Sequence, residues 1–371
     1  MKLIILKTNL KEGLSVVERI VSENNSLPIL KNILLKTVNG KIKISSTNLE
    51  IGISKFIFGK IIEEGGITIP FIPLHNIISN INAERVSIET ISGNLVVKTD
   101  NYQARIQGIN EEEFPIIPKI EDTSRCLEIS SAALKDALTS IMSAAQFSEI
   151  RPELSGILFD FQVTILKLVA TDSFRLAEKT IFTNQFKTGF QNGFKVIVPL
   201  RTIQEVTRTF PKDQTMKLYF DQHQVLFAAE DEELISRLIN GQYPDYEQII
   251  PKAIETELSV PRETFINAVR LVSSFSGKVN DIKLKVRDDG KTMEVFSSNQ
   301  YLGENNYLVP VKTKGGHVDN LSFNWRYLMD GLKILSGETI IFGVNGDSKP
   351  AVLKSQEDNS YFYILMPIKA A

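Results

Sequence analysis

The side chains that most often perform chemistry in enzymes are few in this sequence and stand far apart. The three histidines, His75, His223 and His317, have no partnering motif around them, so each is expected to be a surface or hydrogen-bonded side chain. The acidic runs at 111–113 and 230–233 would alternate direction on a strand or splay on a loop, and neither is expected to form a metal cage. No nucleophilic or metal-dependent site is predicted from these residues.

Sequence motifs for cofactors and nucleotides are also missing. The chain has no G-x-x-x-x-G-K-[ST] phosphate loop, no G-x-G-x-x-G after a strand, no H-E-x-x-H and no C-x-x-C. We therefore predict a protein that is not an enzyme, with no catalytic residue, no cofactor and no metal. An enzyme with an unrecognised site stays a competing interpretation, which the missing motifs disfavour.

Length and composition indicate a globular protein of two or three domains. The chain has 371 residues, of which 43% are hydrophobic and 23% charged, and its formal net charge is −2. That balance disfavours a protein that grips nucleic acid through a basic surface. A single cysteine, Cys126, indicates a reducing compartment. Without an apolar run long enough for a signal peptide or membrane span, a soluble, cytoplasmic protein is expected.

The predicted secondary-structure elements that would position any site form a pattern that repeats three times along the chain. An apolar i, i+4, i+7 pattern typical of a helix recurs, and a second helical pattern follows about 65 residues after each first one. The first set comprises Leu10/Leu14/Val17, Leu134/Leu138/Ile141 and Phe265/Val269/Val272. The second set begins at Leu74, Leu200 and Leu328, each just after a strand-like run. We predict three domains, at 1–121, 122–251 and 252–371.

Between the helices the sequence predicts short strands. Runs such as 42–45, 86–89, 95–98 and 216–220 alternate or are β-branched, and turn signals such as Asn39-Gly40 and Ser92-Gly93 separate them. Each repeat is therefore expected to hold two helices and roughly eight strands, an α+β domain with its helices on one side of the sheet.

Four segments are distinctive: L-P-I-L-K-N-I-L-L at 27–35, T-N-L-E-I at 47–51, A-T-D-S-F-R-L-A at 170–177 and Y-I-L-M-P-I-K at 363–369. Together they resemble the bacterial DNA sliding clamp family, the beta subunit of DNA polymerase III. The resemblance spans all three repeats. It implies clamp domains whose paired helices face a lumen and are backed by antiparallel sheets. It also implies a head-to-tail homodimer, a six-domain ring around double-stranded DNA that tethers the replicative polymerase and confers processivity.

Domain size agrees with a ring of two chains. A 120-residue domain has a radius of gyration of about 14 Å and a diameter of about 35 Å. Three such domains in a circle leave no hole, whereas six leave a lumen roughly 30 Å wide. A DNA duplex is roughly 20 Å across and would fit. A heterologous interface that closes on itself is the expected symmetry.

The six helical windows carry a small positive excess. They hold nine Lys or Arg and six Asp or Glu, which leaves the rest of the chain at −5. Contacts from such helices to DNA would go to phosphates and be independent of sequence. The predicted DNA-facing residues are Lys11, Arg19, Lys135, Arg201, Arg208, Arg262, Arg270, Arg326 and Lys333.

The family resemblance also implies a partner-peptide pocket between the second and third repeats. Apolar walls with one adaptable Met suit short hydrophobic segments from the polymerase, the clamp loader and other clamp-binding proteins. From residue type alone, Leu154, Ile249, Ile364 and Met366 are simply core. Phe174 stands where the family usually has His. The implied walls are Leu154, Thr171, Ser173, Arg175, Leu176, Pro244, Ile249, Ile364 and Met366.

The dimer contact would join the first repeat of one copy to the third repeat of the other, and Ile106 and Phe275 are its predicted apolar residues. Two loops depart from the family: 22–26 lacks a basic residue, and 148–153 is short and lacks an aromatic pair. A triplicated scaffold for carbohydrate or peptide is the other competing interpretation. Its expected aromatic platforms are not evident, since Trp325 is the single tryptophan.

Overall fold

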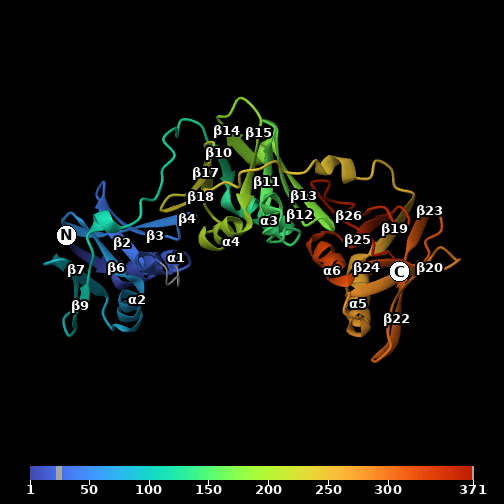
Figure 1. The fold of residues 1–371 in the computed structure, drawn as a ribbon, viewed down its shortest axis with the longest axis horizontal. Coiled ribbons are helices and arrows are strands. Elements are labelled where there is room, and N and C mark those ends of the chain that lie inside the picture. Colours follow the sequence, from blue (N-terminus) through green and yellow to red (C-terminus); the bar gives the residue numbers. More distant parts are fainter. Residues whose placement is uncertain (22–26, 370–371) are drawn as a thin grey trace. The chain divides into compact units, whose positions relative to one another are not determined.

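The computed structural model describes residues 1–21 and 27–369 (Figure 1). The loop at 22–26, noted above for its lack of a basic residue, lies outside the described residues. None of the helices in the described part of the chain is long and apolar enough to cross a membrane.

One order of elements, βαβββββαβββ, runs through each predicted repeat. Among the described residues each repeat thus holds two α-helices, as predicted, and nine strands instead of roughly eight. The first repeat comprises β1 Lys2–Leu6, α1 Lys7–Val17, β2 Asn32–Val38, β3 Lys41–Thr47, β4 Ile51–Ile57, β5 Gly59–Glu63, β6 Gly66–Pro70, α2 Phe71–Asn80, β7 Arg85–Ile91, β8 Asn94–Lys98 and β9 Gln103–Gln107.

The second and third repeats follow the same order. The second comprises β10 Leu127–Ser130, α3 Ser131–Met142, β11 Gly156–Phe161, β12 Ile165–Thr171, β13 Arg175–Phe182, β14 Phe186–Thr188, β15 Phe194–Pro199, α4 Leu200–Thr209, β16 Thr215–Phe220, β17 Gln224–Ala228 and β18 Glu232–Arg237. The third comprises β19 Thr256–Pro261, α5 Arg262–Val272, β20 Asp281–Val286, β21 Thr292–Asn299, β22 Gly303–Pro310, β23 Lys312–Gly315, β24 Leu321–Asn324, α6 Trp325–Ile334, β25 Thr339–Val344, β26 Ala351–Ser355 and β27 Tyr361–Leu365.

The predicted apolar stripes are the buried faces of the helices. Each residue of the three first-helix stripes, such as Leu10, Leu134 and Phe265, is fully buried. In the first repeat this stripe packs α1 on β3 and β4, and α1 also packs against α2. Helical periodicity of apolar residues therefore located all six α-helices correctly.

The chain divides into two compact units, which we call unit 1 and unit 2. Unit 1 comprises Met1–Lys135, Phe186–Phe190 and Arg201–Leu238, and unit 2 comprises Asp136–Gln185, Gln191–Leu200 and Ile239–Ala371. The boundary between the units runs through the second repeat, which contributes strands to both.

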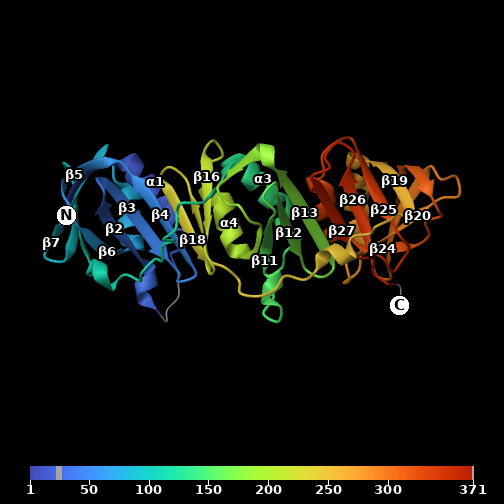
Figure 2. The same ribbon diagram turned by 90° about the horizontal axis from the view of Figure 1, so that it is seen from above.

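Unit 1 contains a five-stranded sheet, ordered β5-β1-β7-β8-β9, and a nine-stranded sheet, ordered β14-β10-β16-β17-β18-β4-β3-β2-β6. The second sheet crosses from repeat to repeat where β18 pairs antiparallel with β4 (Figure 2). We call this pairing the first junction.

Unit 2 is built in the same way. Its nine-stranded sheet has the order β15-β11-β12-β13-β27-β26-β25-β19-β23, and a four-stranded sheet has the order β22-β21-β20-β24. Here β13 of the second repeat pairs antiparallel with β27 of the third. We call this pairing the second junction.

Candidate functional site

The second junction, within unit 2, brings together residues that the sequence predicted for a peptide pocket. In the antiparallel pairing of β13 with β27, Leu176 stands opposite Ile364 and Arg175 stands opposite Leu365. Just beyond the strands, the backbone N–H of Met366 donates to the carbonyl oxygen of Phe174 at 2.8 Å. Residues about 190 positions apart in sequence therefore meet at one end of a continuous sheet.

A tight turn at 171–175 shapes this end of the sheet. The Asp172 carboxylate accepts hydrogen bonds from the backbone N–H groups of Phe174 at 2.9 Å and Arg175 at 3.0 Å. The Thr171 hydroxyl donates to the carbonyl of Arg175 at 2.6 Å, and Ser173 has a positive φ of 77°. These side-chain to backbone bonds are typical of an Asx turn. They leave Ser173 and Phe174 facing solvent, the latter 60% exposed.

The guanidinium of Arg175 is held rigidly beside this turn. Its Nε donates to Asp172 Oδ2 at 2.9 Å and its Nη1 to Asp330 Oδ2 at 2.5 Å, and the group stacks over the ring of Tyr327 at 4.2 Å. Burial lowers the pKa of Arg175, but nearby Tyr363, together with Asp172 and Asp330, outweighs it and the net pKa is raised. Arg175 is therefore a fixed cation in a partly buried setting.

The connector between the second and third repeats packs on the same sheet. Tyr246 is buried in a cluster that includes Leu176 and Ile364, with Tyr243 and Ile250 packed against it. The Tyr243 hydroxyl donates to the carbonyl of Val169 at 3.4 Å. Pro244 and Ile249 lie on this connector, and Ile249 is 45% exposed. An exposed apolar side chain beside a buried cluster suits contact with a bound segment.

Burial separates the predicted pocket residues into two kinds. Leu154, Thr171, Leu176 and Ile364 are buried, so the interpretation as core holds for Leu154 and Ile364. It is wrong for Ile249, which is exposed, and incomplete for Met366, which is half-buried. The backbone N–H of Leu154 donates to the carbonyl of Arg151 at 3.0 Å, and Arg151 Nη1 donates to Ser173 Oγ at 3.1 Å.

The residues that hold this site in place were not found from the sequence. Asp172 could have been found, because it occupies the position of Asn48 in the first repeat, whose side chain accepts from the backbone of Glu50 and Ile51 in the same way. Asp330 lies 155 residues from Arg175 on α6 and gives no local signal. Within the described part of the chain, no group of three or more His, Cys, Asp or Glu side chains could hold a metal ion.

Seven of the nine predicted DNA-facing residues are exposed on or beside the helices of their own repeat. Among them, Arg208 pairs with Glu205 at 3.3 Å on α4, and Arg326 donates to Asn280 Oδ1 at 3.2 Å. The exposed residues are Lys11, Arg19, Arg201, Arg208, Arg270, Arg326 and Lys333.

The other two, Lys135 and Arg262, are half-buried and bind backbone carbonyls. Lys135 Nζ donates to the carbonyl of Phe210, just after α4. Arg262 Nε and Nη2 donate to the carbonyls of Leu332 and Lys333, each at 3.1 Å, at the C-terminal end of α6. A cation at a helix C-terminus stabilises carbonyls that lack helical partners. Both residues therefore have a structural task in the fold.

The two residues predicted for the dimer contact lie at edge strands. Ile106 is on β9, which ends the five-stranded sheet of unit 1. Phe275 is half-buried beside β22, and its Cε1 lies 3.7 Å from the place that a Cβ on Gly303 would take. β22 ends the four-stranded sheet of unit 2. Edge strands expose backbone groups that can pair with a further strand.

Comparison with known proteins identifies the three repeats. Models of the DNA polymerase III beta subunit match its N-terminal domain at residues 1–118, its central domain at 128–245 and its C-terminal domain at 247–369. Together these matches cover almost the whole chain, in the order expected for the family.

Full-length relatives and solved structures agree. The chain is 29% identical over 376 residues to the beta sliding clamp of Synechococcus elongatus, covering 100% of this chain and 99% of the relative. It is 25% identical over 381 residues to that of Bacillus subtilis, covering 100% of both. A crystal structure of the DNA polymerase sliding clamp from Bacillus subtilis has a TM-score of 0.94 at 24% sequence identity. A crystal structure of the DNA polymerase III beta subunit from Thermotoga maritima has a TM-score of 0.88 at 22% sequence identity. Both comparisons cover 100% of both chains. The chain therefore belongs to the DNA polymerase III beta subunit family.

Proposed function

We propose that this chain is a DNA sliding clamp, in which two copies close head to tail around duplex DNA and tether the replicative polymerase. Its family consists of non-catalytic processivity subunits of DNA polymerase III. One observation supports the ring. Both junctions pair the ninth strand of one repeat with the fourth strand of another, and each copy has one further ninth strand and one further fourth strand at a sheet edge.

The junction rule follows from the strand orders. The first junction pairs the ninth strand of the second repeat, β18, with the fourth strand of the first repeat, β4. The second junction pairs the ninth strand of the third repeat, β27, with the fourth strand of the second repeat, β13. The remaining ninth strand, β9, and the remaining fourth strand, β22, are sheet edges among the described strands. A third junction of the same kind would join β9 of one copy to β22 of the next.

Repeat equivalence also predicts the register of that third junction on the β9 side. Ile109 bridges to Thr68 just as Ile239 bridges to Ile197 in the second repeat. Ile106 therefore holds the position of Ser236, which stands opposite Ile51 at the first junction.

On the β22 side, the turn before the strand gives the register. Asn299 accepts from the backbone N–H of Tyr301, as Asp172 accepts from Phe174. Leu302 then holds the position of Arg175, and so of Ile51 in the first repeat. We infer that Ile106 stands opposite Leu302 of the partner subunit, with Phe275 beside this pairing. Leu302 is 59% exposed in the single chain, as expected for an interface residue whose partner subunit is absent.

Closure after two copies is supported by domain size. Taking domains 1–121, 122–251 and 252–371, each about 35 Å across, six in a ring leave a lumen roughly 30 Å wide. When a heterologous junction is repeated around a ring, the assembly closes. Every β9 and every β22 edge strand is then paired.

Binding to DNA would be topological and independent of sequence. Seven of the nine basic residues in the helical windows are exposed, while the rest of the chain has a net charge of −5. A weakly positive helical surface attracts phosphates without holding them tightly, because surface charges are screened by salt. Such loose contact suits a ring that must slide.

The second junction is the proposed attachment site for partners. Its half-buried Met366, exposed Ile249 and fixed Arg175 suit a hydrophobic peptide segment that carries polar or acidic groups. The polymerase, the clamp loader and other replication or repair factors would compete for this site. The proposed location is the cytoplasm, where bacterial chromosomes are replicated.

Sedimentation equilibrium tests the head-to-tail dimer. Leu302→Asp places a carboxylate opposite Ile106 and should convert the dimer to monomer at micromolar concentration, because an unpaired charge at an apolar contact is costly. The control is Ile62→Asp, which alters an exposed apolar residue of β5, at the opposite edge of the sheet that ends in β9. A monomeric wild type, or a dimeric Leu302→Asp variant, would rule out this interface.

Retention on DNA tests the ring. The wild-type protein, loaded onto nicked circular DNA by a clamp loader, should stay bound during gel filtration and be lost once the DNA is cut to a linear form. Equal loss from circular and linear DNA would contradict a topological ring.

A further inference from the structure

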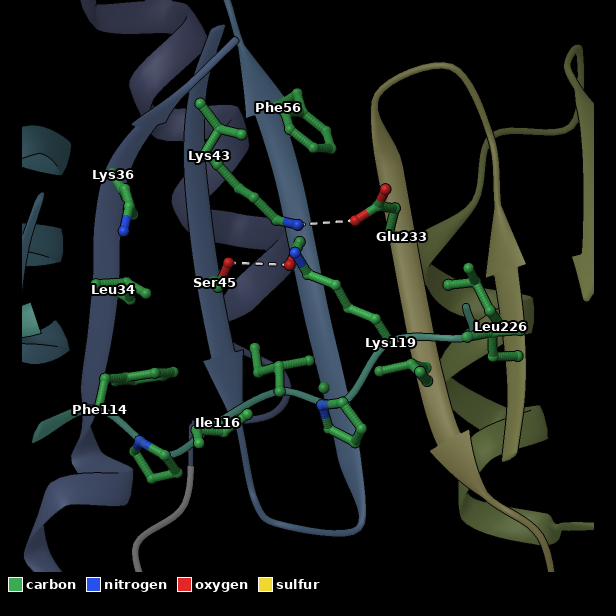
Figure 3. Close-up of a pocket in the computed structure, with 18 of the residues that line it drawn as sticks. Leu34, Lys36, Lys43, Ser45, Phe56, Phe114, Ile116, Lys119, Leu226 and Glu233 are labelled. Carbon is green, nitrogen blue, oxygen red and sulfur yellow. Dashed lines mark hydrogen bonds and ion pairs between the residues drawn. The ribbon is translucent and has the colours of Figure 1, made fainter. Parts of the chain in front are cut away.

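A cavity of about 900 Å³ lies on the face of the nine-stranded sheet of unit 1, at the first junction. Its floor consists of side chains from β2, β3, β4, β17 and β18, and the chain segment 114–123 runs along its rim (Figure 3). We call this segment the first connector. Phe114 at its start is buried, whereas Ile116 is 94% exposed.

The cavity occupies the position of the apolar cluster at the second junction. At the second junction Leu176 stands opposite Ile364, and at the first junction Gly52 stands opposite Ile235 in the same register. The substitution of a leucine by a glycine removes a whole side chain from the floor.

A second pair of positions shows the same difference in size. Val169 stands opposite Glu178 on β12 and β13, and the equivalent residues on β3 and β4 are Ser45 and Ser54. These two serine hydroxyls hydrogen-bond to each other at 2.9 Å and line the cavity, and Figure 3 shows Ser45 on its floor. Smaller side chains at three floor positions therefore leave space above the sheet at the first junction.

The connectors differ in the same sense. At the second junction Tyr246 is 3% exposed and fills the space above the sheet. At the first junction Ile117 covers Gly52, and its Cγ2 lies only 2.6 Å from the place that a Cβ would take. Aliphatic side chains from the first connector therefore cover part of the floor and leave the remainder open.

The charged side chains around the cavity are mostly cationic. Four lysines line it against one acid, Glu233. Lys36, Lys41 and Lys43 have carboxylate partners at 3.1, 3.6 and 2.8 Å, and Lys43 also lies 4.9 Å from the centre of the Phe56 ring. Ion pairs at such partly exposed positions are weak and exchange readily.

Lys119 is the fourth lysine. It lies on the first connector, and in the described part of the chain it has no carboxylate partner within ion-pair distance. Figure 3 shows its side chain reaching from the connector across the strands toward the ammonium group of Lys43. Two ammonium groups thus point into one apolar cavity, where a carboxylate would be favoured.

We propose that this cavity is a second docking site, which takes an apolar peptide segment of a partner protein that carries carboxylates. The apolar side chains of the segment would pack on Leu34, Leu226 and Ile116. Its carboxylates would meet Lys119 and Lys43. The site lies wholly within unit 1, so the inference depends neither on the ring nor on the pocket at the second junction.

Fluorescence anisotropy with a labelled probe peptide, acetyl-Glu-Ile-Phe-Glu-Leu-Glu-amide, tests the site. Lys119→Glu and Ile116→Ser alter exposed residues, so both variants should fold. Lys119→Glu should raise the Kd of the probe about tenfold, and Ile116→Ser should raise it severalfold. The matched control Lys60→Glu reverses an exposed lysine of unit 1 that does not line the cavity, and should leave the Kd unchanged.

A probe in which every Glu is replaced by Gln separates charge from apolar contact. Wild type should bind it more weakly than the Glu probe, and Lys119→Glu should no longer matter, while Ile116→Ser still should. The proposal is overturned if the Glu probe shows no binding at millimolar concentration. It is overturned equally if Met366→Ala weakens binding while Lys119→Glu does not, because the probe would then occupy the second junction.

Discussion

The first junction depends on a buried ion pair that one substitution can test. Lys55 on β4 and Glu232 on β18 stand directly opposite each other, with Nζ 2.8 Å from Oε1. They are only 6% and 2% exposed, whereas Glu12 of α1, 3.0 Å from Lys55, is largely in solvent. Burial lowers the pKa of Lys55, but hydrogen bonds to Glu232 and Glu12 outweigh it and the net pKa is raised. The ammonium group is therefore charged at neutral pH.

Replacing Lys55 by Met keeps the apolar stem and removes the charge. Glu232 is then a buried carboxylate without its partner, which costs about 3–5 kcal/mol in comparable pairs. A factor of ten in an equilibrium constant corresponds to about 1.4 kcal/mol. The equilibrium constant for opening of the first junction should therefore rise by a factor between about one hundred and a few thousand. The double variant Lys55→Met with Glu232→Met removes both charges and should recover most of this loss.

Hydrogen exchange followed by mass spectrometry locates the effect. Peptides that cover 51–57 and 232–237 should exchange faster in Lys55→Met, while peptides that cover 175–182 and 361–365, at the second junction, report on an untouched pairing. The control variant Lys60→Met removes an exposed lysine on neighbouring β5. Unchanged exchange at the first junction in Lys55→Met would refute the reasoning, as would a double variant no better protected than the single one.

Three further substitutions test other parts of the structure. Met366→Ala should weaken binding of the clamp-binding peptide of the replicative polymerase about tenfold, measured by calorimetry, because it removes a half-buried side chain from the pocket wall. Unlike Leu176→Ala, it should not damage the buried core. The control is Ile72→Ala, which alters an exposed residue on α2. Arg262→Ala should lower the free energy of unfolding by about 1–3 kcal/mol, since it removes two hydrogen bonds to the end of α6. Urea titrations followed by the fluorescence of Trp325 on α6 would measure this loss. An equal loss in Arg270→Ala, which alters an exposed residue, would contradict the explanation. Burial raises the pKa of Glu178 above its ordinary value of 4.5. The protonated carboxyl group of Glu178 therefore stabilises the fold fully below pH 4.5, and this stabilisation is lost as pH rises through the raised pKa. Glu178→Gln should remove that decline in urea midpoints between pH 4.5 and 8, and parallel curves for the two proteins would show that the carboxyl group titrates normally.

Local signals in the sequence predicted the elements well. The helices were found because their apolar residues recur with helical period, and the hairpin at 39–40 because Asn39 and Gly40 both adopt positive φ, at 51° and 74°. Three strand-like runs before the second helices became β6, β15 and β24. In each case the deciding interactions lie within a few residues of one another.

Pairings between distant strands could not be predicted in this way. Nothing near β18 indicates that its partner is β4, because that choice depends on matching two strands some 180 residues apart. The same limit applied to Asp330 and to Arg262, whose partners are on other elements. The predicted peptide pocket came from a family resemblance. Its supporting residue Asp172 could have come from comparing the repeats with one another.

The second repeat divides its strands between the two units, so a boundary in the sequence is not a boundary in the folded sheet. A cut after residue 121 would separate β4 from β18 and leave each piece with an uncovered, complementary edge. Lys55 would remain on one fragment and Glu232 on the other. The two fragments would then act as halves of a split protein that rejoin through backbone pairing, and either fragment expressed alone would be prone to aggregate through that edge.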